Sequence, residues 1–228
     1  SISVWVNLSA TTGQHYIYST DNGTNKGRLR CRVINSLPNF TVRDDSNNGL
    51  AIRGTSSVAD GKWHQLTFTY DGSKTIAGLK IYVDGILQST TILNNTALTT
   101  QSYNTTGTIG VSNSTAYFDG QIDEISVWDT EMPLAQIRQW MCQKLNSNHD
   151  SISKLKAYYR FDENTGDTLY DLAGANHGVL TNMTPASDWI VSGAAIGDTS
   201  TYATSFPGLL DLDHSDGDRM RFATGGSH

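Results

Sequence analysis

The chain is poor in charge and has no long apolar run. Asp, Glu, Lys and Arg make up 17% of its 228 residues, and 22 acids against 16 bases give a formal net charge of −6. Because the bases form no cluster in the sequence, we expect neither nucleic acid nor an anionic membrane as a partner. No apolar stretch approaches the roughly 20 residues of a membrane-spanning helix, and the N-terminal residues lack the charged region of a signal peptide.

Cysteine is almost absent. Cys31 lies in a predicted strand and Cys142 at the end of a predicted helix, which admits either one disulfide or two buried thiols. Neither cysteine has a His or a second Cys at zinc-ligand spacing. We favour two buried thiols.

Short runs of alternating apolar and polar residues are abundant, and each run has one apolar face, which predicts half-buried strands. They include residues 2–8, 65–70 and 79–84. Asp71-Gly72 and Asp84-Gly85 are dipeptides that accept the positive φ of tight turns. Residues 62–90 are therefore predicted to form an antiparallel meander of strand, loop, strand, turn and strand.

Residues 133–145 break the strand pattern. Apolar residues recur there at helical spacing, and Pro133 is suited to the first helical position. Residues 155–163 return to strand alternation, and residues 164–198 are rich in Gly, Asn and Asp with few apolar anchors. The composition predicts one all-β domain with a short helix on its surface, because the later segment has too few apolar groups to fold alone.

Three segments together resemble a known family. They are GKWHQLTFTYDGS at 61–73, GLKIYVDGILQSTT at 78–91 and TIGVSNSTAYFDGQIDEISVWDTEMPLAQI at 108–137. In order and spacing they are similar to the laminin-G-like and pentraxin-like jelly rolls of the concanavalin A type, which occur in bacterial secreted and cell-surface proteins. The resemblance implies an all-β, antiparallel two-sheet jelly-roll sandwich with one short surface helix.

The resemblance also divides the chain. Residues 1–192 are expected to form the jelly-roll domain, and residues 193–228 an acidic, turn-rich tail or the stump of a following domain. The opening strand of the family has no counterpart here, so we expect the chain to be a piece of a longer protein. Either residues 203–222 cover the sheet edge that this strand would pair with, or that edge is open to another chain.

Catalytic patterns are missing from the sequence. Laminarinase-type members of this fold carry two glutamates on one strand as nucleophile and acid, whereas Glu124 and Glu131 are separated by a strand end and a turn. No Gly-X-Ser-X-Gly elbow or Gly-rich phosphate loop occurs, and the six histidines are scattered. We therefore predict that the chain is not an enzyme.

The family resemblance suggests calcium near the rim of the sandwich, where carboxylate and amide oxygens are the expected ligands. Asp162, Asp171 and Asn176, from two neighbouring loops, form the first candidate site. Asp123, on the predicted strand face of Ile125, is the second. The alternative is that Asp171 and Asn176 cap turns, and that Asp123 pairs with a base or a backbone amide.

Aromatic side chains in loops are candidate platforms for sugar, because rings stack on sugar faces while Asn side chains bind hydroxyls. Tyr103 and Tyr117 flank a Gly-Thr-Ile-Gly turn, and Asn113 is expected on the same rim as Tyr117. These three residues form the predicted ligand-binding set, whereas most other aromatics are expected in the core.

The sequence thus predicts a non-catalytic carbohydrate-binding or adhesive module of a larger secreted or cell-surface protein, of bacterial type. Its expected partners are a polysaccharide or cell-surface glycan and the neighbouring domains, and calcium is the expected cofactor. A structural spacer and an accessory module of a polysaccharide-degrading enzyme are the alternatives.

Overall fold

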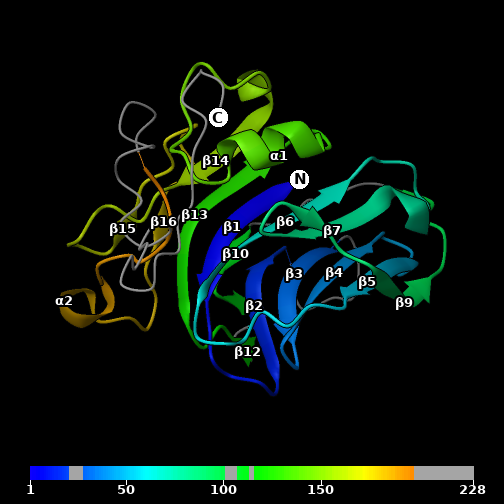
Figure 1. The fold of residues 1–228 in the computed structure, drawn as a ribbon, viewed down its shortest axis with the longest axis horizontal. Coiled ribbons are helices and arrows are strands. Elements are labelled where there is room, and N and C mark those ends of the chain that lie inside the picture. Colours follow the sequence, from blue (N-terminus) through cyan, green and yellow to red (C-terminus); the bar gives the residue numbers. More distant parts are fainter. Residues whose placement is uncertain (21–27, 101–106, 113–115, 198–228) are drawn as a thin grey trace, which may run out of the picture.

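The fold is built on two six-stranded antiparallel sheets (Figure 1). The computed structural model describes residues 1–20, 28–100, 107–112 and 116–197. One hydrophobic core takes side chains from both sheets, so the two sheets pack face to face. This arrangement confirms the predicted all-β jelly-roll sandwich.

The first sheet, called sheet A, has the strand order β14-β13-β1-β6-β7-β8. Its strands are β1 (Ile2–Asn7), β6 (Trp63–Tyr70), β7 (Leu79–Val83), β8 (Ile86–Leu87), β13 (Gln121–Trp128) and β14 (Leu155–Tyr159). The N-terminal strand β1 is central, because it pairs with both β13 and β6. The two ends of the sheet are β14 and β8.

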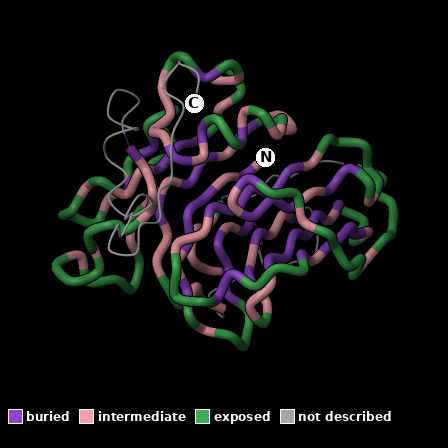
Figure 2. Tube along the Cα trace, viewed as in Figure 1, coloured by how far each residue is buried: buried purple, intermediate pink, exposed green. Residues whose placement is uncertain are grey.

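The second sheet, called sheet B, has the order β10-β2-β3-β4-β5-β9. Its strands are β2 (Gln14–Ser19), β3 (Arg28–Ile34), β4 (Leu37–Arg43), β5 (Gly49–Gly54), β9 (Thr90–Asn95) and β10 (Thr108–Ile109). Alternation along these strands sends apolar side chains inward, and Figure 2 shows buried chain running through both sheets.

Smaller elements surround the two sheets. They are the hairpins β11 (Val111–Ser112) with β12 (Ala116–Tyr117) and β15 (Thr168–Leu169) with β16 (Gly178–Val179), the 3-10 turns η1 (Ile76–Gly78) and η2 (Ile152–Lys154), and the helices α1 (Leu134–Trp140) and α2 (Pro185–Asp188). The predicted helix over 133–145 is confirmed in place but is shorter: Pro133 has an extended ψ of 143° and occupies the N-cap position, and the helix ends at Trp140. The four-residue helix α2 was not predicted.

The predicted meander over residues 62–90 is confirmed in β6, β7 and β8. Asp84 and Gly85 take φ values of 50° and 69° in the turn, the geometry expected of a tight hairpin. The Asp84 carboxylate accepts hydrogen bonds from the backbone amide of Gln65 at 2.9 Å and pairs with His64 at 2.8 Å. This turn joins β7 to β8 within sheet A, and the chain passes to sheet B afterwards, between β8 and β9.

The predicted buried thiols are confirmed. Cys31 is fully buried in the core between the sheets, and Cys142 is buried after helix α1. Burial raises the pKa of the Cys31 thiol well above its usual value, so this cysteine behaves as a small apolar side chain.

The chain packs against the domain as far as the last described residue. Gln143 and Gly197 form an isolated parallel bridge, and a Cβ at Gly193 would lie 2.8 Å from the Trp63 indole nitrogen. Residues 203–222, the segment expected to cover a sheet edge, lie outside the described residues. The division at residue 192 therefore stays a prediction. Among the described residues no helix is both long and apolar enough to cross a membrane.

The core predicts a large loss of stability for the variant Phe68→Ala. The Phe68 ring is fully buried and lies 5.6 Å from the Phe40 ring of the opposite sheet. Removing a ring at this position leaves a cavity that joins the two layers, so we expect the free energy of unfolding to fall by about 3–5 kcal/mol. Urea unfolding of the variant and the wild type measures this difference in the free energy of unfolding. Ile86→Ala, at a side chain that is 61% exposed, is the control and should change the value by less than about 0.5 kcal/mol. Equal effects would contradict the assigned core.

Candidate functional site

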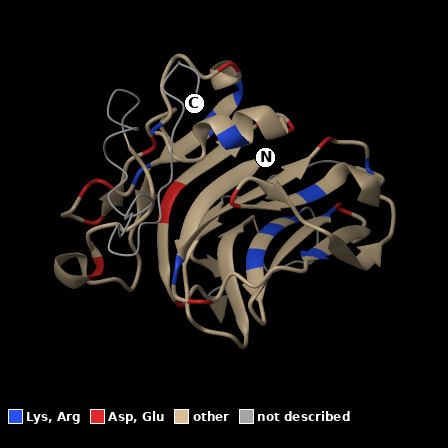
Figure 3. Cartoon of the chain, viewed as in Figure 1, with Lys and Arg blue, Asp and Glu red and all other residues tan. Residues whose placement is uncertain are grey.

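The outer face of sheet B gathers arginines from three neighbouring strands. On β3, arginines alternate with the core residues Leu29, Cys31 and Val33. With the outward arginines of β4 and β5 they form a set that we call the arginine face: Arg28, Arg30, Arg32, Arg43 and Arg53. Figure 3 shows positive charge gathered on β3, β4 and β5.

No negative side chain belongs to the strands that carry this face. The six described strands of sheet B contain no Asp, Glu or Lys. The expectation that bases form no cluster is therefore wrong. A search for contiguous runs misses the face because a strand sends every second residue to the same side, and cross-strand pairing adds residues distant in sequence. The alternation of Arg28, Arg30 and Arg32 was the available signal.

The strand register sets the rows of the face. Arg32 pairs with Asn39, and Asn39 pairs in turn with Arg53. In a second row beside the first, Arg28 pairs with Arg43, whose Nη1 donates to the Asn47 side chain at 2.6 Å. Each row therefore presents donors side by side, and the described strands themselves place no carboxylate between them.

Arg32 is held in place by three hydrogen bonds. Its Nε donates to Oδ1 of Asn39 at 3.0 Å, and its Nη1 donates to Gln14 at 2.9 Å and to the Tyr16 hydroxyl at 2.8 Å. Its guanidinium carbon lies 5.4 Å from the centre of the Tyr16 ring, and that of Arg30 lies 5.5 Å from it. Tyr16 is buried and thus supports the arginines from beneath by cation–π contact.

The arginine face concentrates positive charge at partly buried positions. Burial lowers the pKa of Arg28, and the charges of Arg43 and Arg32 lower it further, against an opposing effect of Tyr16. Burial also lowers the pKa of Arg30, with an opposing effect of Tyr16 and further lowering by Arg32 and Arg43. Such a surface gains electrostatically from a bound anion.

The predicted ligand-binding tyrosines and asparagine are only partly placed. Tyr117 lies on β12, opposite Val111, and is 55% exposed. Tyr103 and Asn113 lie outside the described residues. The predicted aromatic rim therefore stays a prediction, and the arginine face is a separate surface that the sequence analysis missed.

The first calcium candidate is used as a turn cap in this structure. Both oxygens of Asp171 accept hydrogen bonds, from the backbone amides of Tyr158 and Ala173 at 2.9 Å and from the backbone amide and side chain of Asn176 at 3.2 and 3.3 Å. Burial alone would raise the pKa of Asp171, but these bonds outweigh it and lower the pKa. N–H donors around a carboxylate do not suit a cation in this geometry.

Asp162 does not join this pair. Its carboxylate contacts Arg160 and lies 3.7 Å from Nζ of Lys144. The structure thus brings Asp171 and Asn176 together and keeps Asp162 apart. Within the described ranges no group of three or more His, Cys, Asp or Glu side chains could hold a metal, and calcium stays a prediction.

Asp123, the second calcium candidate, lies at an irregularity of β13. Ser3 pairs with Ser126 and Trp5 with Asp123, so β13 has one extra residue there, and Glu124 takes a φ of 49°. This bulge moves Asp123 to the face of Trp5, away from the core side chain Ile125. Its expected place on the face of Ile125 is wrong, because strict alternation fails at a bulge. Burial raises the pKa of Asp123.

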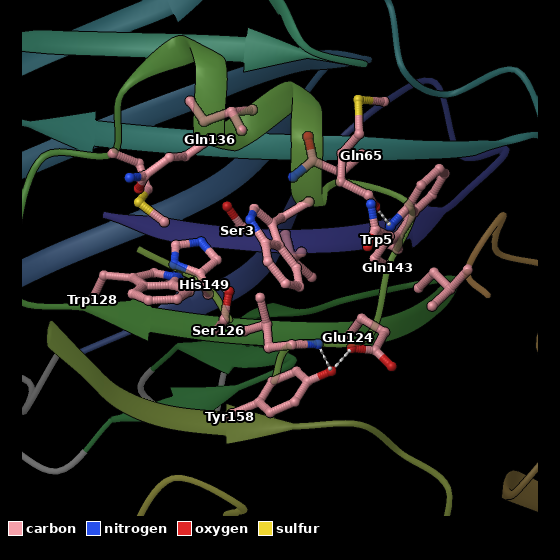
Figure 4. Close-up of a pocket in the computed structure, with 17 residues that line it drawn as sticks. Ser3, Trp5, Gln65, Glu124, Ser126, Trp128, Gln136, Gln143, His149 and Tyr158 are labelled. Carbon is pink, nitrogen blue, oxygen red and sulfur yellow. Dashed lines mark hydrogen bonds between the residues drawn. The ribbon is translucent and has the colours of Figure 1, made fainter. Parts of the chain in front are cut away.

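The same bulge directs Glu124 into a cavity between sheet A and helix α1 (Figure 4). Tyr158 donates a hydrogen bond to the Glu124 carboxylate, and Nε of Arg160 lies 3.8 Å from it. Burial raises the pKa of Glu124 to about 8, against the lowering effect of the Tyr158 bond. Glu124 is therefore mostly protonated near neutral pH.

Aromatic side chains close this cavity. The buried His149 ring lies 4.5 Å from the Trp128 ring and 5.0 Å from the Trp140 ring. The Trp5 indole donates to the carbonyl of Met141 at 2.8 Å. These tryptophans are buried as expected, but they lie beneath helix α1 and not between the two sheets. The contacts are internal, so the cavity serves the packing of α1 on sheet A.

The raised pKa of Glu124 predicts a pH dependence of stability. Because the folded state binds this proton more tightly than the unfolded state, where the pKa is near 4.5, its contribution is complete below that value and is lost as pH rises towards 8. Glu124→Gln keeps a neutral hydrogen-bonding group, so the variant should lose less free energy of unfolding than the wild type between about pH 5 and 8. Urea unfolding across this range measures both slopes. Asp45→Asn, at an exposed acid, is the control, and an unchanged slope in Glu124→Gln would contradict the assignment.

The sequence matches the family model described as the concanavalin A-like lectin/glucanases superfamily, of the laminin G type, over residues 1–138. The match covers more than half of the chain, and the protein belongs to this family. The matched residues include the sheet B strands that carry the arginine face. No curated protein sequence matches the chain.

Solved structures show similar folds. The CBM40 domain of the Ruminococcus gnavus IT-sialidase is 14% identical, with a TM-score of 0.48, and the match covers 60% of this chain and 79% of that one. Domains LG4-5 of the mouse laminin alpha1 chain are 14% identical, with a TM-score of 0.40 and coverages of 59% and 36%. The receptor binding domain of botulinum neurotoxin D is 14% identical, with a TM-score of 0.44 and coverages of 60% and 35%. Similarity at this level does not indicate what this chain binds.

Proposed function

We propose that the chain is a non-catalytic carbohydrate-binding or adhesive module of a larger secreted or cell-surface protein. The observation that carries the proposal is the outer face of sheet B. There, the partly exposed side chains of Arg32, Arg43 and Arg53 lie on a rigid sheet next to the buried Asn39 and Thr41, and together they form a broad polar layer. Side chains of this kind hydrogen-bond sugar hydroxyl and acid groups.

The two sheets differ in what covers their outer faces. Helix α1 packs over sheet A, where Met132, Ile137, Tyr82 and Trp128 form a second apolar cluster. Figure 1 shows both α-helices on the side of β13 to β16, away from β3, β4 and β5. No described helix lies over sheet B, and its outer face is therefore the surface that we assign to recognition.

The absence of acids from sheet B supports binding over hydrolysis. Glycoside hydrolases in general need two carboxyl groups on either side of the scissile bond, one as acid and one as nucleophile or base. The described strands of sheet B supply neither. Because the family description names both lectins and glucanases, this difference in residues, and not family membership, favours a binding module.

The proposal predicts that the protein binds at least one polysaccharide without cleaving it. Affinity gel electrophoresis in gels that contain neutral, carboxylated or sulfated polysaccharides measures binding as retarded migration, and a reducing-sugar assay measures cleavage. We expect retardation by at least one polysaccharide and no release of reducing ends. Heat-unfolded protein is the control for non-specific retention.

Two results would contradict this function. Migration that no polysaccharide changes would favour the structural spacer, and released sugar would show an enzyme. Parallel gels with calcium and with chelator test the predicted cofactor, because a calcium-dependent module binds only in the first. An accessory role in a polysaccharide-degrading enzyme would restrict binding to the polysaccharide that this enzyme cleaves.

A further inference from the structure

This inference rests on the proposed function and names the chemical class of the ligand. We propose that Arg32, Asn39 and Arg53, which we call the central row, bind the oxyanion of an acidic glycan. The oxyanion is a carboxylate or a sulfate, since guanidinium groups pair with both through two parallel hydrogen bonds.

Asn39 supplies a buried donor without a partner. It is fully buried, and its Oδ1 accepts hydrogen bonds from Nε of Arg32 at 3.0 Å and from the Thr41 hydroxyl at 3.2 Å. Two donors on Oδ1 fix the orientation of the amide. Its Nδ2 is then directed away from them and finds no hydrogen-bond partner among the described residues. A buried amide donor without a hydrogen-bond acceptor destabilises the fold. An acceptor on a bound ligand would remove this cost.

Arg53 presents a second unused donor. It lies on the outer face of β5, directly opposite Asn39, and is only partly exposed. Its Nε is buried and has no hydrogen-bond partner in the described part of the chain. A partly buried guanidinium without an acid is costly in the free protein, and it binds an anion more strongly than an exposed lysine would.

Arg32 completes the central row with a fixed geometry. Its three bonds to Asn39, Gln14 and Tyr16 use Nε and Nη1, and Nη2 donates to no side chain of the described residues. Neighbouring strands place opposite Cα atoms about 5 Å apart, so the row spans about 10 Å. Arg32 is therefore oriented before any ligand arrives, which reduces the entropy lost on binding.

The charge of the whole molecule argues for short-range recognition. The chain carries a formal net charge of −6, so it does not attract a polyanion from a distance. Favourable contacts must come from the row itself, where no carboxylate of the sheet competes for the guanidinium groups. An acidic sugar suits this better than a nucleic acid, which is bound through long tracts of basic residues.

The experiment compares variants of Arg53 for binding to polygalacturonate, dextran sulfate and neutral dextran. For wild-type protein we expect binding to at least one of the two acidic polymers, stronger than to dextran, and weaker as salt rises. Arg53→Gln should lose about tenfold or more in affinity, and Arg53→Lys should recover only part of it, because lysine keeps the charge but not the forked donor. Asn39→Leu, which removes the unused donor, should weaken binding as well.

The control variant is Lys156→Gln, which removes one positive charge from β14 of sheet A and should bind like the wild type. Circular dichroism and melting temperature confirm that each variant is folded. The carboxylated and sulfated polymers separate the two oxyanions. An unchanged affinity in folded Arg53→Gln would overturn the proposed row, as would equal losses in Arg53→Gln and Lys156→Gln.

The outcomes also separate this inference from the proposed function. Binding of neutral dextran or another neutral glycan, unaffected by Arg53→Gln and no weaker than binding of the acidic polymers, would overturn the acidic ligand and leave a carbohydrate-binding module. An absence of binding to every polysaccharide would overturn both.

Discussion

Strict alternation along paired strands is the constraint on which the rest of this protein depends. Each core strand must send apolar side chains between the sheets, because no other element can bury them. Phe40 and Phe68 meet there from opposite layers. The same alternation leaves every second side chain on an outer face, where packing places no demand on it. Recognition residues can therefore vary on the outer face without disturbing the core.

The two outer faces use this freedom differently. On sheet A, tryptophans and buried polar groups receive helix α1, and a bulge at Glu124 directs a carboxyl group into the packed cavity. On sheet B, arginines and Asn39 remain as donors without acids among them. One face stabilises the domain, and the other holds the unsatisfied Nδ2 of Asn39 and Nε of Arg53, which we assign to the ligand. The unsatisfied Nδ2 of Asn39 is expensive in a free protein, which argues that the arrangement serves binding.

Much of the fold followed from local pattern. Alternation and the Asp84-Gly85 turn identified the meander, and helical spacing identified α1, because both depend on residues close in sequence. The site depended on register and was not found. Arg32, Asn39 and Arg53 become neighbours only through strand pairing, and the extra residue at Glu124 moved Asp123 to the opposite face. Neither effect is visible in composition or in contiguous motifs.

The most direct test of the account is to observe the central row while an acidic oligosaccharide is added. Side-chain NMR resonances of the Asn39 amide and of the Nε groups of Arg32 and Arg53 report on it, and assignment by single substitution makes each identifiable. The account predicts that titration with an oligogalacturonate or a sulfated oligosaccharide shifts these resonances together, saturably and with one affinity. Saturable shifts confined to residues elsewhere, with the row unchanged, would contradict it.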